Sequence, residues 1–328
     1  MLKLKYLFDQ RELAKMLIDN WKYDEESLSL FDYFRISSNA IYPFKVDGKM
    51  AFLRFVPSSE KSISEIEEEL TLMVLLRNNA FAVPRIIPSM DGRLIETKET
   101  PWGSYHAVVF EGVGQKSLEN VPLNDERMFS YGLLLGEFHE LSKNRIANQI
   151  SRKSVFDILA DLAETATHTN EQACLSKEIQ RLRTELEALK AQGYAMGVIH
   201  YDFELDNIMV DENTGKLFAI DFDDAMNGFY GQDIERVLNS IISECDDDKV
   251  DSFTQAFLKG YTSVCGNGSE ALLEHRNLYK AFADLYKYMR IRKSLTERWD
   301  HEPDWMQHLR KRLEGWMKGY LEAICVNA

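Results

Sequence analysis

Short runs of apolar, β-branched and aromatic residues, bounded by turn residues, recur in the first third of the chain, as they do in β-strands. The predicted strands cover residues 34–46, 50–56, 85–87 and 105–110. The first two are separated by Asp47-Gly48-Lys49, a sequence typical of a hairpin turn. One helix is expected after the hairpin, because Ser62 or Ser64 can cap it and apolar residues then recur at helical spacing. Residues 1–110 are therefore predicted to be mostly strands.

Farther along the chain, apolar residues recur every three or four positions, which predicts amphipathic helices. The clearest of these helices cover residues 129–141, 155–163 and 175–192, and the pattern is interrupted by a β-hairpin at residues 207–210 and 217–220. We therefore predict an α+β chain of two lobes. Residues 1–110 would form a small N-terminal lobe with an antiparallel sheet and one helix. Residues 111–328 would form a larger, mainly helical C-terminal lobe.

The amino-acid composition and net charge exclude some classes of binding partner. The 328 residues include 39 Lys and Arg against 53 Asp and Glu, a net charge of −14, which argues against binding to nucleic acid. Charged residues interrupt the N-terminus, and no run approaches the roughly 20 apolar residues that cross a membrane. The four cysteines have neither zinc-site nor disulfide-framework spacing, so we expect small buried side chains in a reduced, cytoplasmic protein. The oligomeric state is not indicated.

Polar residues bracket the open end of the second hairpin. His200, Asp202 and Asn207 precede it, and Asp221 follows it. Because neighbouring strands lie about 5 Å apart, Asn207 and Asp221 should converge. Two converging oxygen ligands suit Mg²⁺, which keeps some waters and also takes phosphate oxygens. The arrangement predicts nucleotide-dependent phosphoryl transfer, with Asp202 accepting or orienting the proton of an acceptor hydroxyl. A metal-dependent hydrolase that uses the same carboxylates is the chemical alternative.

Three segments of this region resemble the aminoglycoside phosphotransferase and choline kinase family. The segments are His200–Asn207, Ile220–Ala225 and Gln232–Ile234. The resemblance implies a protein-kinase-like fold, with ATP, or alternatively GTP, and Mg²⁺ as cofactors. It implies that Asp202 is the catalytic aspartate and that His200 supports it by orienting the loop. Asn207 and Asp221 would be the Mg²⁺ ligands, and Asp233, at a helix start, would hold the catalytic loop.

The same resemblance assigns nucleotide contacts to the N-terminal lobe. Arg54 stands where these kinases carry a lysine that grips the phosphates, and it keeps the charge. Glu69 is its expected acidic partner, with Glu65, one turn earlier, as the alternative.

The remaining nucleotide contacts are assigned to a loop and a hinge. The loop that would meet the phosphates, Ser37–Ala40, has no glycine, and Ser38 is its expected contact. The hinge would present the carbonyl of Glu111 and the amide of Val113 to the adenine.

A small molecule with a hydroxyl group is the expected acceptor. Between residues 272 and 312, ten Lys and Arg outnumber six Asp and Glu by four, whereas a polycationic aminoglycoside would prefer a carboxylate-lined site. A typical aminoglycoside is therefore not expected. A protein acceptor is the alternative, because residues 221–228 also resemble bacterial stress-response Ser/Thr kinases of this fold. A third hypothesis is a catalytically silent nucleotide-binding module, favoured by Arg54 and the glycine-free loop.

Overall fold

The computed structural model describes residues 1–146, 149–167, 171–266 and 273–327. The chain packs as two compact units, each assembled from segments that are distant in sequence. The first unit comprises Met1–Val74, Pro84–Val113 and Arg290–Glu314, and the second comprises Leu75–Val83, Gly114–Met289 and Gly315–Ala328. Among the described residues, no helix is both long and apolar enough to cross a membrane.

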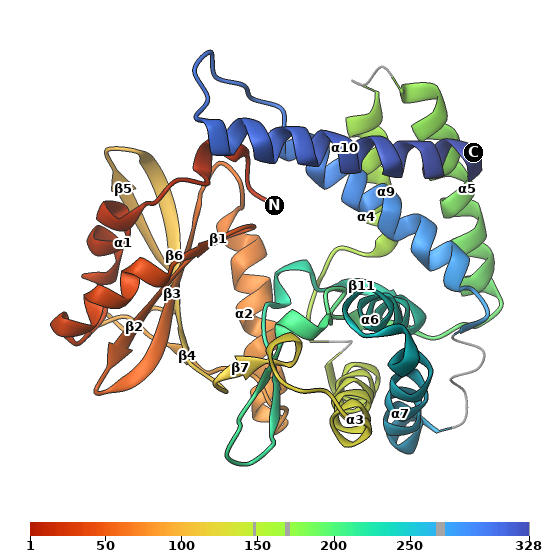
Figure 1. The fold of residues 1–328 in the computed structure, drawn as a ribbon, viewed down its shortest axis with the longest axis horizontal. Helices are drawn as coiled ribbons and strands as arrows, with labels where there is room; N and C mark the ends of the chain where they lie inside the picture. The colour runs from red at the N-terminus through yellow and green to blue at the C-terminus, as the bar shows by residue number, and fades with distance from the viewer. Residues whose placement is uncertain (147–148, 168–170, 267–272, 328) are drawn as a thin grey trace. The chain divides into compact units, whose positions relative to one another are not determined.

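An antiparallel sheet of six strands is the framework of the first unit (Figure 1). Its strands are β1 (Arg35–Ile36), β2 (Ala40–Val46), β3 (Lys49–Pro57), β4 (Ile86–Ile87), β5 (Glu96–Thr100) and β6 (Gly103–Glu111). They are ordered β1-β2-β3-β6-β4, and β5 also pairs with β6. The predicted hairpin joins β2 to β3 through Asp47 and Gly48, whose φ angles of 50° and 76° suit a tight two-residue turn.

Helical segments cover both faces of this sheet. The helices in the N-terminal part of the first unit are η1 (Leu4–Tyr6), α1 (Arg11–Ile18), η2 (Glu25–Tyr33) and α2 (Ile63–Asn78), where η marks a 3₁₀ or π helix. Leu53 and Phe55 of β3 pack in a core with α1 and η2, whereas Arg54 faces Glu69 of α2. Figure 1 shows α1 and α2 on opposite sides of the sheet. The prediction of mostly strands before residue 110 was therefore wrong for α1 and η2.

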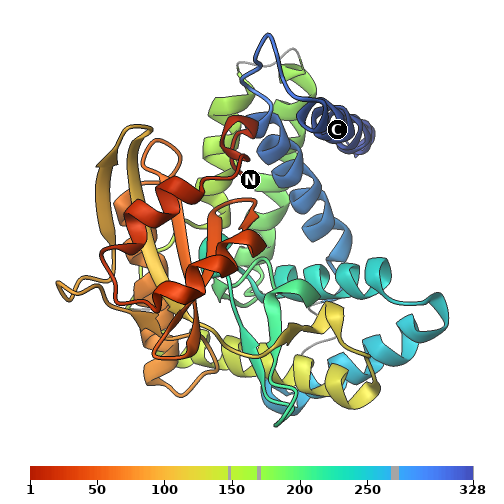
Figure 2. The ribbon, with the colours of Figure 1, turned by 60° about the vertical axis from the view of Figure 1, so that its left-hand side comes forward.

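Helices dominate the second unit. Besides the end of α2, it contains, wholly or in part, α3 (Asp125–Leu141), α4 (Val155–Ala166), α5 (Gln172–Ala191), α6 (Tyr230–Glu244), α7 (Asp247–Cys265), α9 (Arg276–Ser294) and α10 (Asp304–Asn327). A single π-helical turn, η4 (Ser142–Ile146), extends α3. Apolar side chains of α4, α5, α9 and α10 share one core, and Figure 2 shows α5 and α9 side by side. Helices α3 and α7 can approach closely because Gly132 has no side chain. A Cβ atom at this position would lie only 1.9 Å from the Phe257 carbonyl oxygen.

Short strands and 3₁₀ turns carry the candidate chemistry in this unit. They are β7 (Lys116–Ser117), η3 (Leu118–Asn120), β8 (Met196–Ile199), η5 (Leu205–Asn207), β9 (Ile208–Val210), β10 (Leu217–Ala219), η6 (Phe222–Asp224) and β11 (Met226–Phe229). The predicted hairpin is formed by β9 and β10. Strand β11 was not predicted, because only helix was expected after residue 224. It pairs antiparallel with β8.

Two cysteines form a disulfide. Cys174 in the first turn of α5 is bonded to Cys325 near the end of α10, across 151 positions of sequence. Cys245 and Cys265 are free and partly buried. The prediction of four small buried apolar side chains was wrong for the bonded pair, because a pairing over such a separation leaves no local pattern. Disulfides are rare in reducing compartments, so this bond counts against the expected cytoplasmic location.

Candidate active site

The loop between β8 and β9 is fixed by a buried carboxylate. Asp233, in the first turn of α6, accepts hydrogen bonds from the backbone N–H groups of His200 (2.9 Å) and Tyr201 (2.6 Å). Tyr201 has a φ of 66°, a left-handed conformation that costs a non-glycine residue about 1–2 kcal/mol. The two hydrogen bonds offset that cost. Asp233 therefore holds the loop between β8 and β9, as predicted, while the catalytic role of this loop stays a prediction.

A histidine and a tyrosine complete the surroundings of this carboxylate. Nε2 of His139 lies 3.0 Å from Asp233 Oδ2, and Nδ1 of His139 lies 2.9 Å from the Tyr261 hydroxyl. A neutral imidazole has one donor and one acceptor, so Nε2–H donates to Asp233 and the hydroxyl donates to Nδ1. Burial raises the pKa of Tyr261, which keeps this donor protonated. No local sequence pattern predicted these contacts, since His139 and Tyr261 come from α3 and α7.

His200 links the loop to the open end of the hairpin, where β10 ends. Its ring is fully buried, with Nε2 located 2.9 Å from the Ile220 carbonyl oxygen. Nδ1 accepts a bond of 3.3 Å from the backbone N–H of Asp202, so Nε2 carries the proton. His200 thereby ties the segment before Asp221 to the segment that carries Asp202. These contacts suit the supporting role that was predicted for it.

The carboxylate of Asp202 is held on both of its oxygens. Nδ2 of Asn207 donates to Oδ2 at 3.0 Å and to the Asp202 carbonyl oxygen at 2.9 Å. Nη2 of Arg236 donates to Oδ1 at 2.9 Å and also pairs with Glu204 at 2.5 Å. Burial raises the pKa of Glu204, although Arg236 opposes the effect. Sequence reasoning missed Arg236, yet its position three residues after Asp233 on α6 placed it on the same helix face.

Asn207 and Asp221 flank the two hairpin strands, as predicted. The N–H of Ile220 donates to the Asn207 carbonyl oxygen at 3.0 Å, which sets the two ligand-bearing segments side by side. Because the amide nitrogen of Asn207 is bonded to Asp202, its side-chain oxygen is the atom that would bind a metal, and the predicted roles of Asn207 and Asp221 as Mg²⁺ ligands stay predictions. In the described part of the chain, no group of three or more His, Cys, Asp or Glu side chains could hold a metal. Two oxygen donors fit Mg²⁺ that completes its coordination with water and nucleotide.

In the first unit, Arg54 and Glu69 form a buried two-pronged ion pair. Nη1 lies 2.6 Å from Oε1 and Nη2 lies 2.8 Å from Oε2. Glu65 instead accepts hydrogen bonds from the backbone N–H and hydroxyl of Ser62, and thereby caps α2. Of the two acidic partners considered, the structure therefore places Glu69 against Arg54.

A second cation, which the sequence analysis did not consider, adjoins this pair. Nζ of Lys61 lies 3.2 Å from Glu69 Oε2, so one carboxylate faces two cations. The guanidinium of Arg54 also lies over the ring of Phe110, 4.8 Å from its centre. The arrangement concentrates positive charge on the face of the sheet that carries α2.

The other predicted nucleotide contacts lie in the same unit. Ser38 is in the bend between β1 and β2, where its hydroxyl accepts a hydrogen bond of 3.0 Å from Arg290. Glu111 ends β6, and its N–H donates to the Arg85 carbonyl oxygen at 2.8 Å. Val113 is the last residue of the segment that belongs to this unit. The roles of Ser38, Glu111 and Val113 stay predictions.

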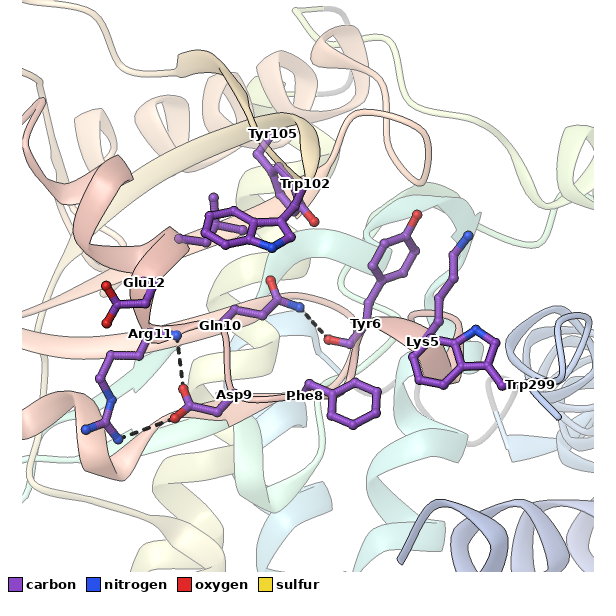
Figure 3. Close-up of a pocket in the computed structure, with 11 residues that line it drawn as sticks. Lys5, Tyr6, Phe8, Asp9, Gln10, Arg11, Glu12, Trp102, Tyr105 and Trp299 are labelled. Carbon is purple, nitrogen blue, oxygen red and sulfur yellow. Dashed lines mark hydrogen bonds and ion pairs between the residues drawn. The ribbon is translucent and has the colours of Figure 1, made fainter. Parts of the chain in front are cut away.

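A cavity of about 830 Å³ opens elsewhere in the first unit (Figure 3). Tyr6, Trp102 and Trp299 contribute aromatic rings to its wall, and the guanidinium of Arg11 is paired with Asp32 at 2.6 Å. The side chains that line this cavity include none of the predicted site residues. None of these lining residues belongs to the loop between β8 and β9.

The antiparallel sheet of the first unit and the mainly helical second unit are those of a protein-kinase-like fold. Residues 37–272 match the sequence model of the phosphotransferase enzyme family, and the chain belongs to that family. The family resemblance, the α+β kinase-like fold and the assignment as a phosphotransferase acting on alcohol groups are confirmed.

Several solved structures share this fold. An amicoumacin kinase bound to AMP-PNP and Ca²⁺ has 16% identity and a TM-score of 0.74, over 98% of this chain and 95% of its own. A microcompartment-associated aminopropanol kinase has 22% identity and a TM-score of 0.67, over 96% and 98%. An ethanolamine kinase of Plasmodium vivax has 13% identity and a TM-score of 0.61, over 97% and 94%. No curated protein sequence matches the chain.

Proposed function

We propose that this protein is an ATP- and Mg²⁺-dependent kinase that transfers the γ-phosphate to a hydroxyl group of a small molecule. The observation that carries the proposal is the fixed carboxylate of Asp202, held by Asn207 on one oxygen and by Arg236 on the other. GTP is the alternative nucleotide. The fold's nucleotide-bound neighbours support the choice of a nucleoside triphosphate, since one was solved with AMP-PNP and Ca²⁺.

The residues divide the work of phosphoryl transfer. Asp202 would accept or orient the proton of the acceptor hydroxyl, because a general base must lie within hydrogen-bond reach of that proton. Asn207 and Asp221 would hold Mg²⁺, which neutralises charge on the phosphates when bound. Arg54, oriented by Glu69, would contribute a permanent positive charge to the triphosphate.

The two lobes would take different substrates. We propose that residues 1–110 bind the nucleotide, with Ser38 at the phosphates and Glu111 and Val113 at the adenine. Residues 111–328 would carry the catalytic loop and the acceptor site. A small acceptor is supported by the names of fold neighbours, which include kinases of an antibiotic and of amino alcohols. The local excess of four positive charges between residues 272 and 312 speaks against a typical aminoglycoside.

Nucleotide binding can be tested by thermal unfolding. ATP with Mg²⁺ should raise the Tm, and Asp221→Ala should abolish the increase without lowering the Tm of the free protein by a similar amount. Asp251→Ala, at an exposed position on α7, is the matched control and should respond to Mg²⁺ and ATP like the wild type. No increase with any nucleotide would reject the nucleotide-dependent reaction.

Turnover separates the remaining hypotheses. A panel of small hydroxyl compounds, coupled to ADP release, should give a signal that Asp202→Ala eliminates. Phosphate incorporated only into protein would favour the Ser/Thr kinase alternative. Stabilisation by nucleotide with neither kind of turnover would favour the catalytically silent module.

We also propose a cytoplasmic location, which the redox state of Cys174 and Cys325 in cells tests directly. Thiol trapping during rapid lysis should find Cys174 and Cys325 reduced in cells, because cytoplasmic thiols are kept reduced. Finding the bonded pair in trapped extracts would place the protein in an oxidising compartment instead.

A further inference from the structure

Aromatic rings form much of the wall of the cavity in the first unit. Of the eleven residues that line it, five are aromatic, namely Tyr6, Phe8, Trp102, Tyr105 and Trp299. Figure 3 shows Trp102 and Tyr105 together on one side and Phe8 and Trp299 together on another. All the lining residues belong to the first unit, and the volume of about 830 Å³ falls within the range of small-molecule sites. The cavity therefore has the size and the apolar wall of a ligand site.

The tryptophans at this cavity are exposed to an unusual degree. Trp102 and Trp299 are 56% and 43% exposed, whereas tryptophan is highly buried on average. The ring of Phe8 stacks on Trp299 with 5.3 Å between ring centres and meets Trp305, also 43% exposed, edge-on at 5.2 Å. The backbone N–H of Trp102 donates to the Thr100 hydroxyl at 3.2 Å, which fixes the turn that carries this indole. Exposed aromatic area gathered around a concave site indicates that a ligand covers it.

Each of the four charged side chains that line the cavity already has a partner of opposite charge. The pairs are Lys5 with Glu297 (2.7 Å), Arg11 with Asp9 (3.4 Å) and Glu12 with Lys15 (2.9 Å). The ammonium group of Lys5 also lies over the ring of Tyr6, 5.0 Å from its centre, so a cation already occupies that aromatic face. A charged ligand would have to compete with these ion pairs, whereas a neutral ligand would not.

The hydroxyl of Tyr105 is the polar group of this wall that is left for a ligand. Tyr105 is only 3% exposed, and no residue in the described part of the chain forms a hydrogen bond with its hydroxyl. Burial raises the pKa of Tyr105, which keeps the hydroxyl protonated and able to donate. By contrast, the Gln10 amide donates to the Tyr6 carbonyl oxygen at 2.5 Å.

These polar contacts favour an aromatic ligand over a sugar. A ligand with one polar group can be satisfied by the Tyr105 hydroxyl. A sugar would bring several hydroxyl groups, which would lose water and find few partners among side chains that are already paired. Aromatic rings, in addition, gain from offset and edge-on contacts with other rings beyond the apolar area that they bury.

We propose that this cavity binds a neutral aromatic molecule that carries one hydrogen-bonding group, with its ring against Trp102 and Trp299 and its polar group on the Tyr105 hydroxyl. The lining contains none of the residues assigned to phosphoryl transfer. The inference therefore does not depend on the proposed kinase function.

The test compares probes that differ from one another in a single property. The reference probe is naphthamide, a neutral two-ring aromatic amide. The others are its fully hydrogenated counterpart, the anion naphthoate, the cation naphthylmethylammonium and the sugar methyl glucoside. Saturation-transfer NMR with the full chain measures each Kd. We expect naphthamide to bind with a Kd below about 1 mM and about fivefold or more tightly than every other probe.

Three variants test the contacts that the proposal names. Trp102→Ala and Trp299→Ala each remove an exposed ring and should raise the Kd of naphthamide about fivefold. Tyr105→Phe keeps the ring that meets Phe55 edge-on and removes only the hydroxyl, so the Kd should rise about two- to tenfold. The matched control is Trp316→Ala, which removes a ring that is 52% exposed and lies outside the cavity lining, and its Kd should equal that of the wild type. If Trp299→Ala does not fold, the other two variants decide.

Addition of AMP-PNP with Mg²⁺ separates this cavity from the proposed nucleotide site. The Kd of naphthamide should be the same with and without the nucleotide. Displacement of naphthamide by AMP-PNP would place the probe at the nucleotide site and overturn the inference. The inference would also be overturned by a wild type that does not bind naphthamide, by tighter binding of any other probe, or by an unchanged Kd in Trp102→Ala or Tyr105→Phe.

Discussion

Replacing Asp233 by Asn changes one oxygen of a buried carboxylate into an amide nitrogen. In the wild type, Oδ2 accepts from the backbone N–H of His200 and from His139, while Oδ1 accepts from the N–H of Tyr201. The amide nitrogen cannot accept any of these bonds. Whichever way the amide is turned, one or two of the three bonds are lost and an N–H group is left facing another donor.

The expected cost follows from the bonds that are lost. A hydrogen bond to a charged group is worth about 1.5–3 kcal/mol. In the orientation that abandons Tyr201, its left-handed backbone also loses the contact that offsets a cost of about 1–2 kcal/mol. We therefore expect Asp233→Asn to lower the free energy of unfolding by about 3–5 kcal/mol, a large share of the 5–15 kcal/mol typical of folded domains.

Urea denaturation followed by circular dichroism measures this change. Asp251→Asn, the exposed control, should stay within about 0.5 kcal/mol of the wild type. In the absence of urea, and at a temperature at which Asp233→Asn is still folded, the kcat of this variant should fall, because the position of Asp202 depends on the same loop. A loss of less than about 1 kcal/mol together with unchanged kcat would refute the role assigned to Asp233.

Three further changes test other contacts. Arg54→Lys keeps the charge but loses one of two hydrogen bonds to Glu69, so we expect the free energy of unfolding to fall by about 1–2 kcal/mol. The KM for ATP should also change. Urea midpoints equal to those of the wild type would contradict the role assigned to this pair. Cys174→Ser should lower the Tm by as much as a reducing agent lowers it in the wild type. The reason is that opening a loop of 151 positions removes up to about 5 kcal/mol of stability in the chain-entropy model. A Tm unchanged by both the substitution and the reducing agent would argue against the bond. The pKa of Glu204 is raised from 4.5, so the folded chain holds the extra proton and this group's stabilisation is lost as pH rises above that value. Urea midpoints of Glu204→Gln should therefore fall less than those of the wild type as pH rises from 4.5, and parallel profiles would contradict the shift.

Local sequence signals predicted the features that depend on a few neighbouring residues. The turn at Asp47 and Gly48 and the hairpin after Asn207 are both present, because their strands pair with the next strand along the chain. The spacing of Asp202, Asn207 and Asp221 brought these residues to the same end of the second hairpin for the same reason.

Other features depend on packing that no local pattern records. Helix α1 is only eight residues long and is stabilised by its four buried apolar side chains rather than by its own length. His139 reaches Asp233 from a helix 94 positions away, and the Cys174–Cys325 bond joins still more distant segments.

The most direct test of the account compares binding with turnover in Asp202→Asn. Calorimetry should show that this variant binds AMP-PNP with Mg²⁺ within about threefold of the wild type, because the proposed metal and nucleotide residues are unchanged. Phosphorus NMR should show the wild type converting ATP and a small hydroxyl compound into ADP and a phosphate ester. In the variant, kcat should fall by about 10²-fold or more, the usual contribution of a general base. Turnover within tenfold of the wild type would contradict the assignment of Asp202 as the catalytic carboxylate.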